Sequence, residues 1–234
     1  MLRSLPDEDA KKLLKASKVN TYARRESLVS EGDKSDTFHI VLDGRVAIRV
    51  TRPTGDTAIV NILGPDSHFG EVSLLTQEQS RRTASVVALE PVRTLSIPAS
   101  VFHDLRERNP RLEALVSRLL AQRVDELSAQ LLEAMYDTLE RRVVRRLVAL
   151  TVTFGGDSSP AAKPVTIPLT QDELAELVGG TRPSVNQVLR RFVDEGMVEL
   201  SRGRIVVTDA AALRRAASHY PPRGRAWPSG RMTG

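Results

Sequence analysis

Two short motifs in the first half of the chain contain the residue types that bind phosphate groups and sugar hydroxyls. The first is Phe69-Gly70-Glu71-Val72-Ser73, and the second, after a polar stretch, is Arg81-Arg82-Thr83. A glycine lets the backbone approach a ligand closely, a carboxylate accepts a hydrogen bond from a ribose hydroxyl, and an arginine beside a hydroxyl residue binds a phosphate. Each element is ordinary by itself, since loop glutamates and arginines are commonly solvated. Their combination makes the two motifs candidates for ligand binding.

A second set of polar residues lies on two predicted helices near the C-terminus. Thr170 and Glu173 have the spacing of a capping box, so a helix is expected to begin there. It is expected to stop at Gly179-Gly180. Thr181 is the expected cap of a second helix, which carries Pro183 in its first turn, where the missing N–H is harmless.

The second of these helices has the pattern of a DNA-recognition helix. One of its faces is apolar, with Val185, Val188, Leu189 and Phe192. The remaining positions are polar or basic, and they are Arg182, Ser184, Asn186, Gln187, Arg190 and Arg191. Two short helices joined by a tight glycine turn form a helix-turn-helix. Residues 197–200 and 205–208 are expected to pair across the turn at 201–204, which adds a wing to the module.

The positive charge of the chain is concentrated in its last part. The chain has 34 Lys+Arg and 29 Asp+Glu, a net charge of +5. Residues 1–137 hold 19 basic and 20 acidic residues, and residues 138–234 hold 15 and 9, so the net charges are −1 and +6. Nucleic-acid phosphates favour clustered cations, which agrees with a DNA-binding module in the second part. A basic tail that aids solubility is the alternative explanation of the charge alone.

The composition excludes several classes of protein. The chain has no cysteine, which removes disulfides, thiolate-ligated iron–sulfur clusters, zinc-thiolate sites and thiol nucleophiles. Hydrophobic residues make up 41% and charged residues 27%, values that indicate a globular rather than a disordered or fibrous chain. We find neither a run of about 18 apolar residues nor a secretory signal, so we expect an intracellular protein.

Residues 28–97 have the pattern of short strands separated by turn residues. Roughly eight strands at a spacing of about 8–12 residues predict a small barrel or jelly roll. The Asp43-Gly44 step lies between two apolar runs, residues 37–42 and 45–50, and is the strongest short signal for a β-hairpin. We therefore expect those two runs to pair. Further strands are expected at residues 57–63, after a turn at Thr54-Gly55-Asp56, and at residues 84–88 and 92–97.

A long helix is predicted to follow Pro110. Apolar residues recur there at spacings of three and four, which indicates a helix of about 28 residues that reaches Asp137. Such a helix is longer than one small barrel can cover with a single face, and its near-heptad seam predicts pairing with a second copy of the chain. A core helix within one chain is the alternative.

Over residues 5–215 the chain resembles the superfamily of the cyclic-AMP receptor protein and the FNR regulators. Phe69-Gly70-Glu71 and Arg82-Thr83-Ala84 match the phosphate-binding cassette of cyclic-nucleotide-binding domains. Glu31-Gly32-Asp33 and Gly44-Arg45-Val46 are similar to turns of that domain. A barrel, a long helix and a winged helix also follow one another in the order that this superfamily has.

The resemblance implies a role for each residue of the cassette. Cyclic AMP is the expected effector. In members that respond to it, two positions of the central helix present hydroxyl groups to its base. In this chain those positions fall on about Glu126 and Leu127, which cannot make that contact. The stretch between the two motifs is one residue longer than in the cyclic-AMP receptor protein, so Arg81 is an alternative to Arg82. The implied contacts are Glu71 with the ribose 2′-hydroxyl, Arg82 and Thr83 with the cyclic phosphate, and the backbone of Gly70, Val72 and Ser73 around it.

In the DNA-reading module the resemblance runs over residues 169–208. Arg182 matches the residue that reads guanine, because a guanidinium group can bind O6 and N7 together. Pro183 stands where the cyclic-AMP receptor protein usually has a glutamate that accepts from cytosine, so the half-site should differ. Base contacts are also expected from Ser184, Gln187 and either Asn186 or Arg190, and phosphate contacts from Thr170, Gln171, Ser201 and Arg202.

These inferences predict an α+β protein with three parts and a tail. The resemblance implies a cytoplasmic transcriptional regulator and not an enzyme. It implies a homodimer that binds cyclic AMP and holds no metal ion. The implied partners are a pseudo-palindromic site on double-stranded DNA and RNA polymerase. The expected parts are a cyclic-nucleotide-binding β jelly roll (1–108), a central dimerisation helix with a hinge (109–138), a winged helix-turn-helix (139–216) and a disordered tail (217–234).

Two other functions are considered. The first keeps the architecture but makes the protein a DNA-binding regulator that needs no effector. The second is an enzyme that uses the barrel as a cupin-like metal site. That site would need clustered histidine and carboxylate ligands, and the isolated His39 and His68 do not supply them.

Overall fold

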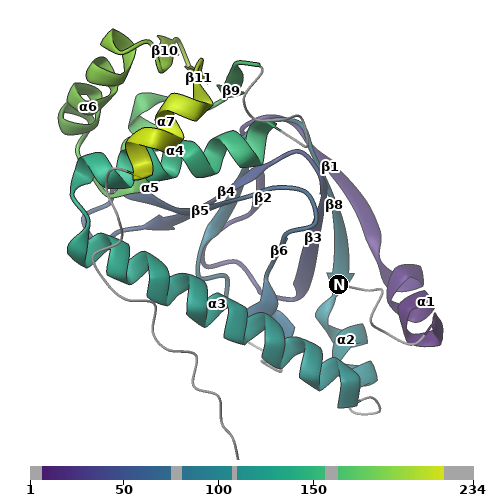
Figure 1. Cartoon of the computed structure of the whole chain (residues 1–234). Coiled ribbons are helices and arrows are strands. Elements are labelled where there is room, and N and C mark those ends of the chain that lie inside the picture. The colour runs from purple at the N-terminus through teal and green to yellow at the C-terminus, as the bar shows by residue number, and fades with distance from the viewer. Residues whose placement is uncertain (1–6, 75–80, 107–109, 156–162, 219–234) are drawn as a thin grey trace, which may run out of the picture. The chain divides into compact units, whose positions relative to one another are not determined.

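The structure is a computed structural model that describes residues 7–74, 81–106, 110–155 and 163–218 (Figure 1). The chain divides into two compact units, residues 1–130 and 131–234, which we call the N-terminal and C-terminal units. The boundary falls inside α3 (Pro110–Tyr136), the helix that was expected after Pro110. The tail predicted from residue 217 lies, from residue 219 onward, outside the described residues.

The described strands of the N-terminal unit form two four-stranded antiparallel sheets. This arrangement confirms the predicted β-sheet domain. One sheet has the order β1-β8-β3-β6, with strands Lys18–Tyr22, Val92–Pro98, Thr37–Asp43 and His68–Phe69. The other has the order β2-β7-β4-β5, with strands Ser27–Val29, Ser85–Ala88, Val46–Thr51 and Thr57–Leu63.

The hairpin predicted around Asp43-Gly44 is wrong. Strand β3 pairs with β8 and β6, whereas β4 pairs with β5 and β7, so the turn carries the chain from one sheet to the other. The backbone of Gly44 has a φ of +76°, and a Cβ there would lie 2.2 Å from the carbonyl oxygen of Pro91. The glycine is therefore explained by a close approach to the β7–β8 connection and not by a two-residue hairpin. The second predicted turn is correct, because β4 and β5 pair around Gly55.

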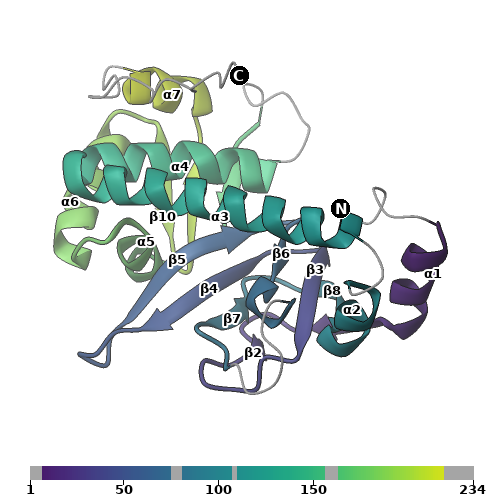
Figure 2. The ribbon, with the colours of Figure 1, turned by 90° about the horizontal axis from the view of Figure 1, so that it is seen from below.

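Two apolar clusters hold the N-terminal unit together. The first includes Val41 of β3 and Val46 of β4, so the two strands meet in one core although they belong to different sheets. The second joins β3 and β8 to the helices α1 (Asp7–Ala16), α2 (Ala99–Arg106) and the first part of α3. Figure 2 shows α1 and α2 next to each other beside β8. The members of the second cluster from these helices are Leu13, Phe102, Leu105, Leu112, Val116 and Leu119.

The C-terminal unit has the predicted winged helix-turn-helix. Its strands form a small sheet with the order β10-β11-β9, in which β9 is an element that the sequence pattern had not indicated. The elements are α4 (Leu139–Gly155), β9 (Val165–Ile167), α5 (Gln171–Val178), α6 (Arg182–Asp194), β10 (Val198–Ser201), β11 (Arg204–Val207) and α7 (Ala210–Ser218).

The helix ends of this module are those that the sequence predicts. Thr170 and Glu173 form a complete capping box, in which the Glu173 carboxylate accepts from the backbone N–H of Thr170. Gly179 closes α5 in the left-handed conformation, with a φ of 64°. Thr181 caps α6, and Pro183 lies in its first turn. The buried face of α6 consists of Val185, Leu189 and Phe192 with Val188 partly buried beside them.

Within the described residues, no helix is long and apolar enough to cross a membrane. The same residues contain no group of three or more histidine, cysteine, aspartate or glutamate side chains that could hold a metal ion.

Candidate functional site

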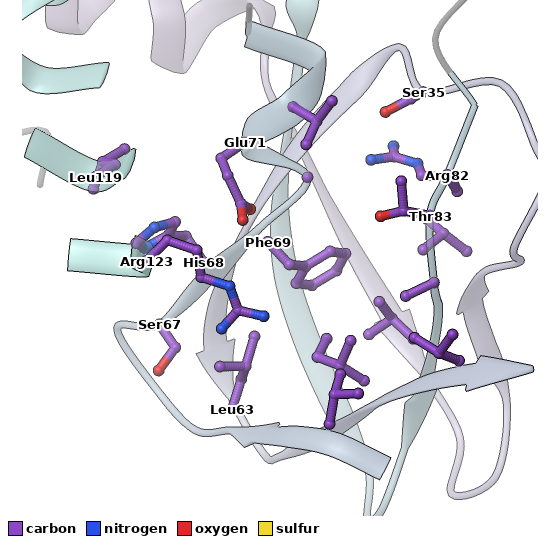
Figure 3. A pocket seen from close by; sticks show the side chains of 18 of the residues that line it. Ser35, Leu63, Ser67, His68, Phe69, Glu71, Arg82, Thr83, Leu119 and Arg123 are labelled. Atoms are coloured by element: carbon purple, nitrogen blue, oxygen red, sulfur yellow. The ribbon is translucent and has the colours of Figure 1, made fainter. Parts of the chain in front are cut away.

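The N-terminal unit contains a pocket of about 520 Å³ that lies between the two predicted motifs (Figure 3). Its apolar wall comes mainly from the sheet that contains β4 and β5, through Ile48, Val50, Val60, Leu63 and Val86. Most of its charged residues come from the two motifs and from α3. The polar residues from these three segments include Glu71, Arg82, Thr83, Gln122, Arg123 and Glu126, and Ser35, Asp66, Ser67 and His68 also line the pocket. The pocket therefore offers an apolar surface beside charged groups of both signs.

Gly70 forms the corner that brings the first motif to the pocket. It follows β6 with a φ of +84° and leads into η2 (Glu71–Leu74), a 3-10 turn. A Cβ at Gly70 would lie 2.6 Å from Nη1 of Arg82 and 2.8 Å from the carbonyl oxygen of Thr37. Only glycine combines this left-handed backbone with so close an approach of a side chain. Figure 3 shows the carboxylate of Glu71, the next residue, turned into the pocket.

Arg82 is a buried cation at the pocket. Its relative exposure is 7%, and its Nη2 donates to the carbonyl oxygen of Thr37 at 2.8 Å and to Thr37 Oγ1 at 2.7 Å. Its Nε and Nη1 are buried and have no hydrogen-bond partner among the described residues. Burial lowers the pKa of this guanidinium, while Asp36, Asp33 and Glu71 act in the opposite direction. Unpaired donors on a buried cation are what a phosphate or carboxylate would satisfy.

A buried histidine, His39, contacts the same threonine hydroxyl as Arg82. His39 is 3% exposed and stacks on Phe69, with ring centroids 4.6 Å apart and planes 4° apart. Its Nε2 lies 3.0 Å from Thr37 Oγ1. Because a guanidinium only donates, the Thr37 hydroxyl accepts from Arg82 and has its own hydrogen available for Nε2. Burial, with a smaller effect of Arg82 and against Asp36, lowers the pKa of His39 to about 4, so the ring is neutral near pH 7.

The structure brings most of the predicted effector residues together. Gly70, Glu71, Val72, Arg82 and Thr83 all line the pocket. Ser73 is absent from the lining, because its hydroxyl is buried and donates to the carbonyl oxygen of Gly70 at 2.6 Å.

Two arginines line the pocket next to each other in sequence. Arg81 is exposed and donates to the carbonyl oxygen of Gly32, so of the two Arg82 is the buried one. The ligand contacts of all these residues remain predictions.

Sequence reasoning missed two groups of residues at the site, one that supports Arg82 and one that lines the pocket. Thr37 and His39 are two residues apart on β3, so their side chains lie on the same face of the strand. This spacing is visible in the sequence and could have indicated that the two residues act together. The second group comes from α3, where Glu126 was named but Leu119, Gln122 and Arg123 were not. Their spacing of three and four residues places them on one face of the helix. Leu127, the other residue named on α3, is 47% exposed and does not line the pocket.

The predicted DNA-contacting residues lie mostly on the surface of the C-terminal unit. The side chain of Arg182 is 65% exposed, and its Nε lies 3.3 Å from Asp172 Oδ1. Asn186 and Gln171 are half-buried, and Thr170 is half-buried with its hydroxyl used in the capping box. The exposed members of the set are Ser184, Gln187 and Arg190 on α6 and Ser201 and Arg202 at the turn of the wing.

Helix α4 fixes the two helices of this module. Arg142 Nη1 donates to the carbonyl oxygen of Val178 at 2.8 Å, at the C-terminal end of α5. Glu140 and Arg191 form an ion pair between α4 and α6. Arg142 therefore contacts the end of α5, just before the turn, and Glu140 contacts α6 near its C-terminal end.

A buried ion-pair cluster marks the start of α4. Asp137 has a side-chain exposure of 6%, and its two carboxylate oxygens lie 2.9 Å from Arg141 Nη1 and 2.6 Å from Arg145 Nη1. The residue at the end of α3 is in this way bound to the first turns of α4.

Known proteins match both units. Residues 19–109 match the cyclic nucleotide-binding domain, and residues 141–216 match the Crp-like helix-turn-helix domain. The CRP-like cAMP-activated global transcriptional regulator of Mycobacterium tuberculosis is 29% identical over 196 residues, which cover 84% of this chain and 86% of the relative. The global nitrogen regulator of a Nostoc species is 29% identical over 199 residues, 84% of this chain and 88% of the relative. A solved CRP/FNR-family regulator from Thermus thermophilus has the same fold, with a TM-score of 0.70 and 23% sequence identity. The match covers 88% of this chain and 100% of the solved one.

Proposed function

The chain belongs to the CRP/FNR family of transcriptional regulators, and from this membership we propose that it is a homodimer controlled by a cyclic nucleotide. The observation that carries the proposal is Arg82, a buried cation with two unpaired nitrogens at a pocket that also contains Glu71. Both named relatives are regulators, and the name of the Mycobacterium relative specifies transcription.

The effector is proposed to bind with its phosphate at Arg82 and Thr83. A cyclic phosphodiester is an anion with oxygen acceptors, which suits the free Nε and Nη1 of the arginine. Glu71 is proposed to accept from the ribose 2′-hydroxyl, and the backbone around Gly70 to surround the phosphate. Cyclic AMP is the first candidate because the name of the Mycobacterium relative contains it.

The DNA site is proposed to be read by α6. Arg182 is assigned to a guanine, with Ser184, Gln187 and one of Asn186 and Arg190 at neighbouring bases. Thr170, Gln171, Ser201 and Arg202 are assigned to phosphates, which set the register of the protein on the duplex. A DNA-bound regulator of this kind is expected in the cytoplasm, with RNA polymerase as a further partner.

The second copy of the chain is proposed to pack along α3. Six large apolar side chains on this helix are between 47% and 63% exposed, which is costly for a helix that remains in water. Burying them against the same helix of another copy would remove that apolar surface from water. They are Val124, Leu127, Leu131, Leu132, Met135 and Tyr136.

The proposed limits of the functional parts follow from these roles. Residues 1–108 are the sensor, residues 109–138 the dimerisation helix and hinge, and residues 139–216 the DNA-binding domain. Effector binding controls DNA affinity only if the DNA-competent state binds the effector more tightly. A symmetric dimer then requires half-sites about one helical turn apart.

The proposal is tested by replacing Arg82. Removing one partner of a buried charged contact costs about 2–5 kcal/mol, so Arg82→Ala is expected to weaken cyclic nucleotide binding by at least about 30-fold. Isothermal titration of the full chain with cyclic AMP and cyclic GMP measures this, and sedimentation checks that the dimer persists. Arg81→Ala is the matched comparison, with a smaller expected loss because Arg81 is exposed.

Two outcomes would contradict the proposal. If Arg81→Ala causes the larger loss, Arg81 holds the phosphate. If the wild-type chain binds neither nucleotide and its affinity for operator DNA is unchanged by both, the protein is an effector-independent regulator of the same fold.

A further inference from the structure

The wall of the pocket that α3 contributes has its own chemistry. Gln122, Arg123 and Glu126 all line the cavity, and the Nη1 of Arg123 lies 3.1 Å from Oε2 of Glu126. Figure 3 shows Arg123 extending from α3 into the pocket, while Arg82 and Thr83 come from another side of it. The pocket therefore has a third arginine besides Arg81 and Arg82, and this one is paired with a carboxylate.

The charges around His68 place these groups in one neighbourhood. Burial lowers the pKa of His68, Glu71 and Glu126 raise it, and Arg123 lowers it further. Glu71 of η2 and Arg123 and Glu126 of α3 thus all lie close enough to His68 of β6 to act on its pKa. Among the described lining residues from α3 none has a hydroxyl group, so this helix offers a guanidinium, a carboxylate and an amide.

We infer that Arg123 and Glu126 make the pocket prefer a guanine base to an adenine base. Guanine presents O6 and N7 as neighbouring acceptors, which an arginine binds with two parallel hydrogen bonds. It also presents N1–H and the N2 amino group as neighbouring donors, which a carboxylate accepts. Adenine has an amino group in place of O6, so an arginine there meets a donor, and it has no donor at N1. The pair of side chains is complementary to guanine on both counts.

The rest of the pocket agrees with a base at this place. Ile48, Val60 and Leu63 belong to the apolar wall, which gives a flat aromatic ring a surface away from water. A ligand with a second anionic group is the other partner that Arg123 would suit. Glu71 and Glu126 disfavour that ligand, because two carboxylates and one guanidinium leave this end of the pocket with a negative balance.

This inference rests on the proposed function and changes its ligand from cyclic AMP to a guanine nucleotide. Three 3′,5′-cyclic nucleotides separate the possibilities, because they share phosphate and ribose and differ only in the base. Cyclic GMP has both sets of groups, cyclic IMP keeps O6, N7 and N1–H but lacks the amino group, and cyclic AMP lacks O6. Isothermal titration of each into the full wild-type chain is expected to give affinities in the order cyclic GMP, cyclic IMP, cyclic AMP, with at least about 10-fold between the first and the last.

Cyclic AMP binding as tightly as cyclic GMP, or more tightly, would overturn the inference and leave the proposed function standing. If none of the three nucleotides binds, the proposed function fails and takes the inference with it. The wild-type protein alone decides between these results, so the test does not depend on whether a variant folds.

Variants then show which side chain reads the base. Arg123→Gln is expected to weaken cyclic GMP and cyclic IMP by about 10-fold and cyclic AMP by no more than about 3-fold. Glu126→Gln is expected to reduce the difference between cyclic GMP and cyclic IMP, because the amino group is the only feature that separates them. Arg118→Gln is the matched control, since Arg118 lies on the same helix, is exposed and does not line the pocket. An equal loss for all three nucleotides with Arg123→Gln would show a general effect of charge and refute base reading.

Discussion

The pocket and the recognition helix use their arginines in opposite ways. Arg82 is 7% exposed and donates two hydrogen bonds to Thr37 before any ligand arrives. The side chain of Arg182 is 65% exposed on the first turn of α6 and pairs with Asp172 at 3.3 Å. The pocket cation loses its water when the chain folds, whereas the recognition cation must lose water and rotamer freedom when DNA binds. The difference indicates a preformed sensor and an adaptable reader.

The C-terminal unit repeats this contrast within itself. Asp137 is buried with Arg141 at a distance of 2.9 Å, and both side chains are 6% exposed. Arg191 and Glu195 form an i,i+4 pair at 3.7 Å in which both side chains are about half exposed, at 51% and 52%. If burial decides how much a charged pair matters, the first pair should affect stability far more than the second.

The largest expected effect is therefore that of Asp137→Ala. The substitution leaves the buried guanidinium of Arg141 without the carboxylate of Asp137. Removing one partner of a buried ion pair costs about 3–5 kcal/mol. The free energy of unfolding of the C-terminal unit is measured from its transition when the full chain is denatured with guanidinium. Glu195→Ala is the matched control and should change it by no more than about 0.5 kcal/mol. Equal losses from the two variants would break the comparison.

The next effect concerns His39, which lies behind the pocket arginine. Its pKa in the folded chain is about 4, below the ordinary value of 6.5, because the ring is buried near Arg82. The unfolded chain therefore binds a proton at His39 that the folded chain does not, and the free energy of unfolding falls as the pH falls from about 6.5 to 4. The total contribution expected from this residue is about 3 kcal/mol.

The measurement compares the wild-type chain with His39→Gln. Denaturant titrations between about pH 7 and 4.5 should give a steeper loss of stability for the wild type, because only the wild type carries the titrating ring. Carboxylates titrate in both proteins and cancel in the difference. Parallel curves over this range would mean that His39 is protonated without penalty and that its burial does not exclude the charge.

Local features of the sequence predicted the C-terminal unit better than the pocket. The capping box needs only Thr170 and Glu173, which are three residues apart, so the pattern itself contains the contact. The Asp43-Gly44 turn was misread because a turn signal does not say which sheet the next strand joins. That choice depends on partners far along the chain, since β4 pairs with β5 and β7 and Pro91 approaches Gly44 closely.

The pocket depends on contacts that cross the sequence. Arg82 is held by Thr37, which is 45 residues away, and no local pattern connects the two. Arg123 lines the pocket because the preceding turns of α3 pack Leu112 and Val116 into the core, which fixes the face that the helix presents. The residue types of the cassette could be recognised from the sequence, whereas the residues that complete its walls required the fold.

The smallest expected effect is that of Arg182→Ala on operator binding. An exposed arginine that reads one guanine contributes about 1–3 kcal/mol, and its loss should relax specificity at one base pair while sparing nonspecific binding. Arg202→Ala removes a phosphate contact instead, so it should weaken all sequences alike and reduce the dependence of affinity on salt. Fluorescence anisotropy with the selected operator and with scrambled DNA, at several salt concentrations, separates the two patterns. If Arg182→Ala weakens both DNAs equally, the residue contacts the DNA backbone, and it would resemble Arg82, whose proposed partner is also a phosphate.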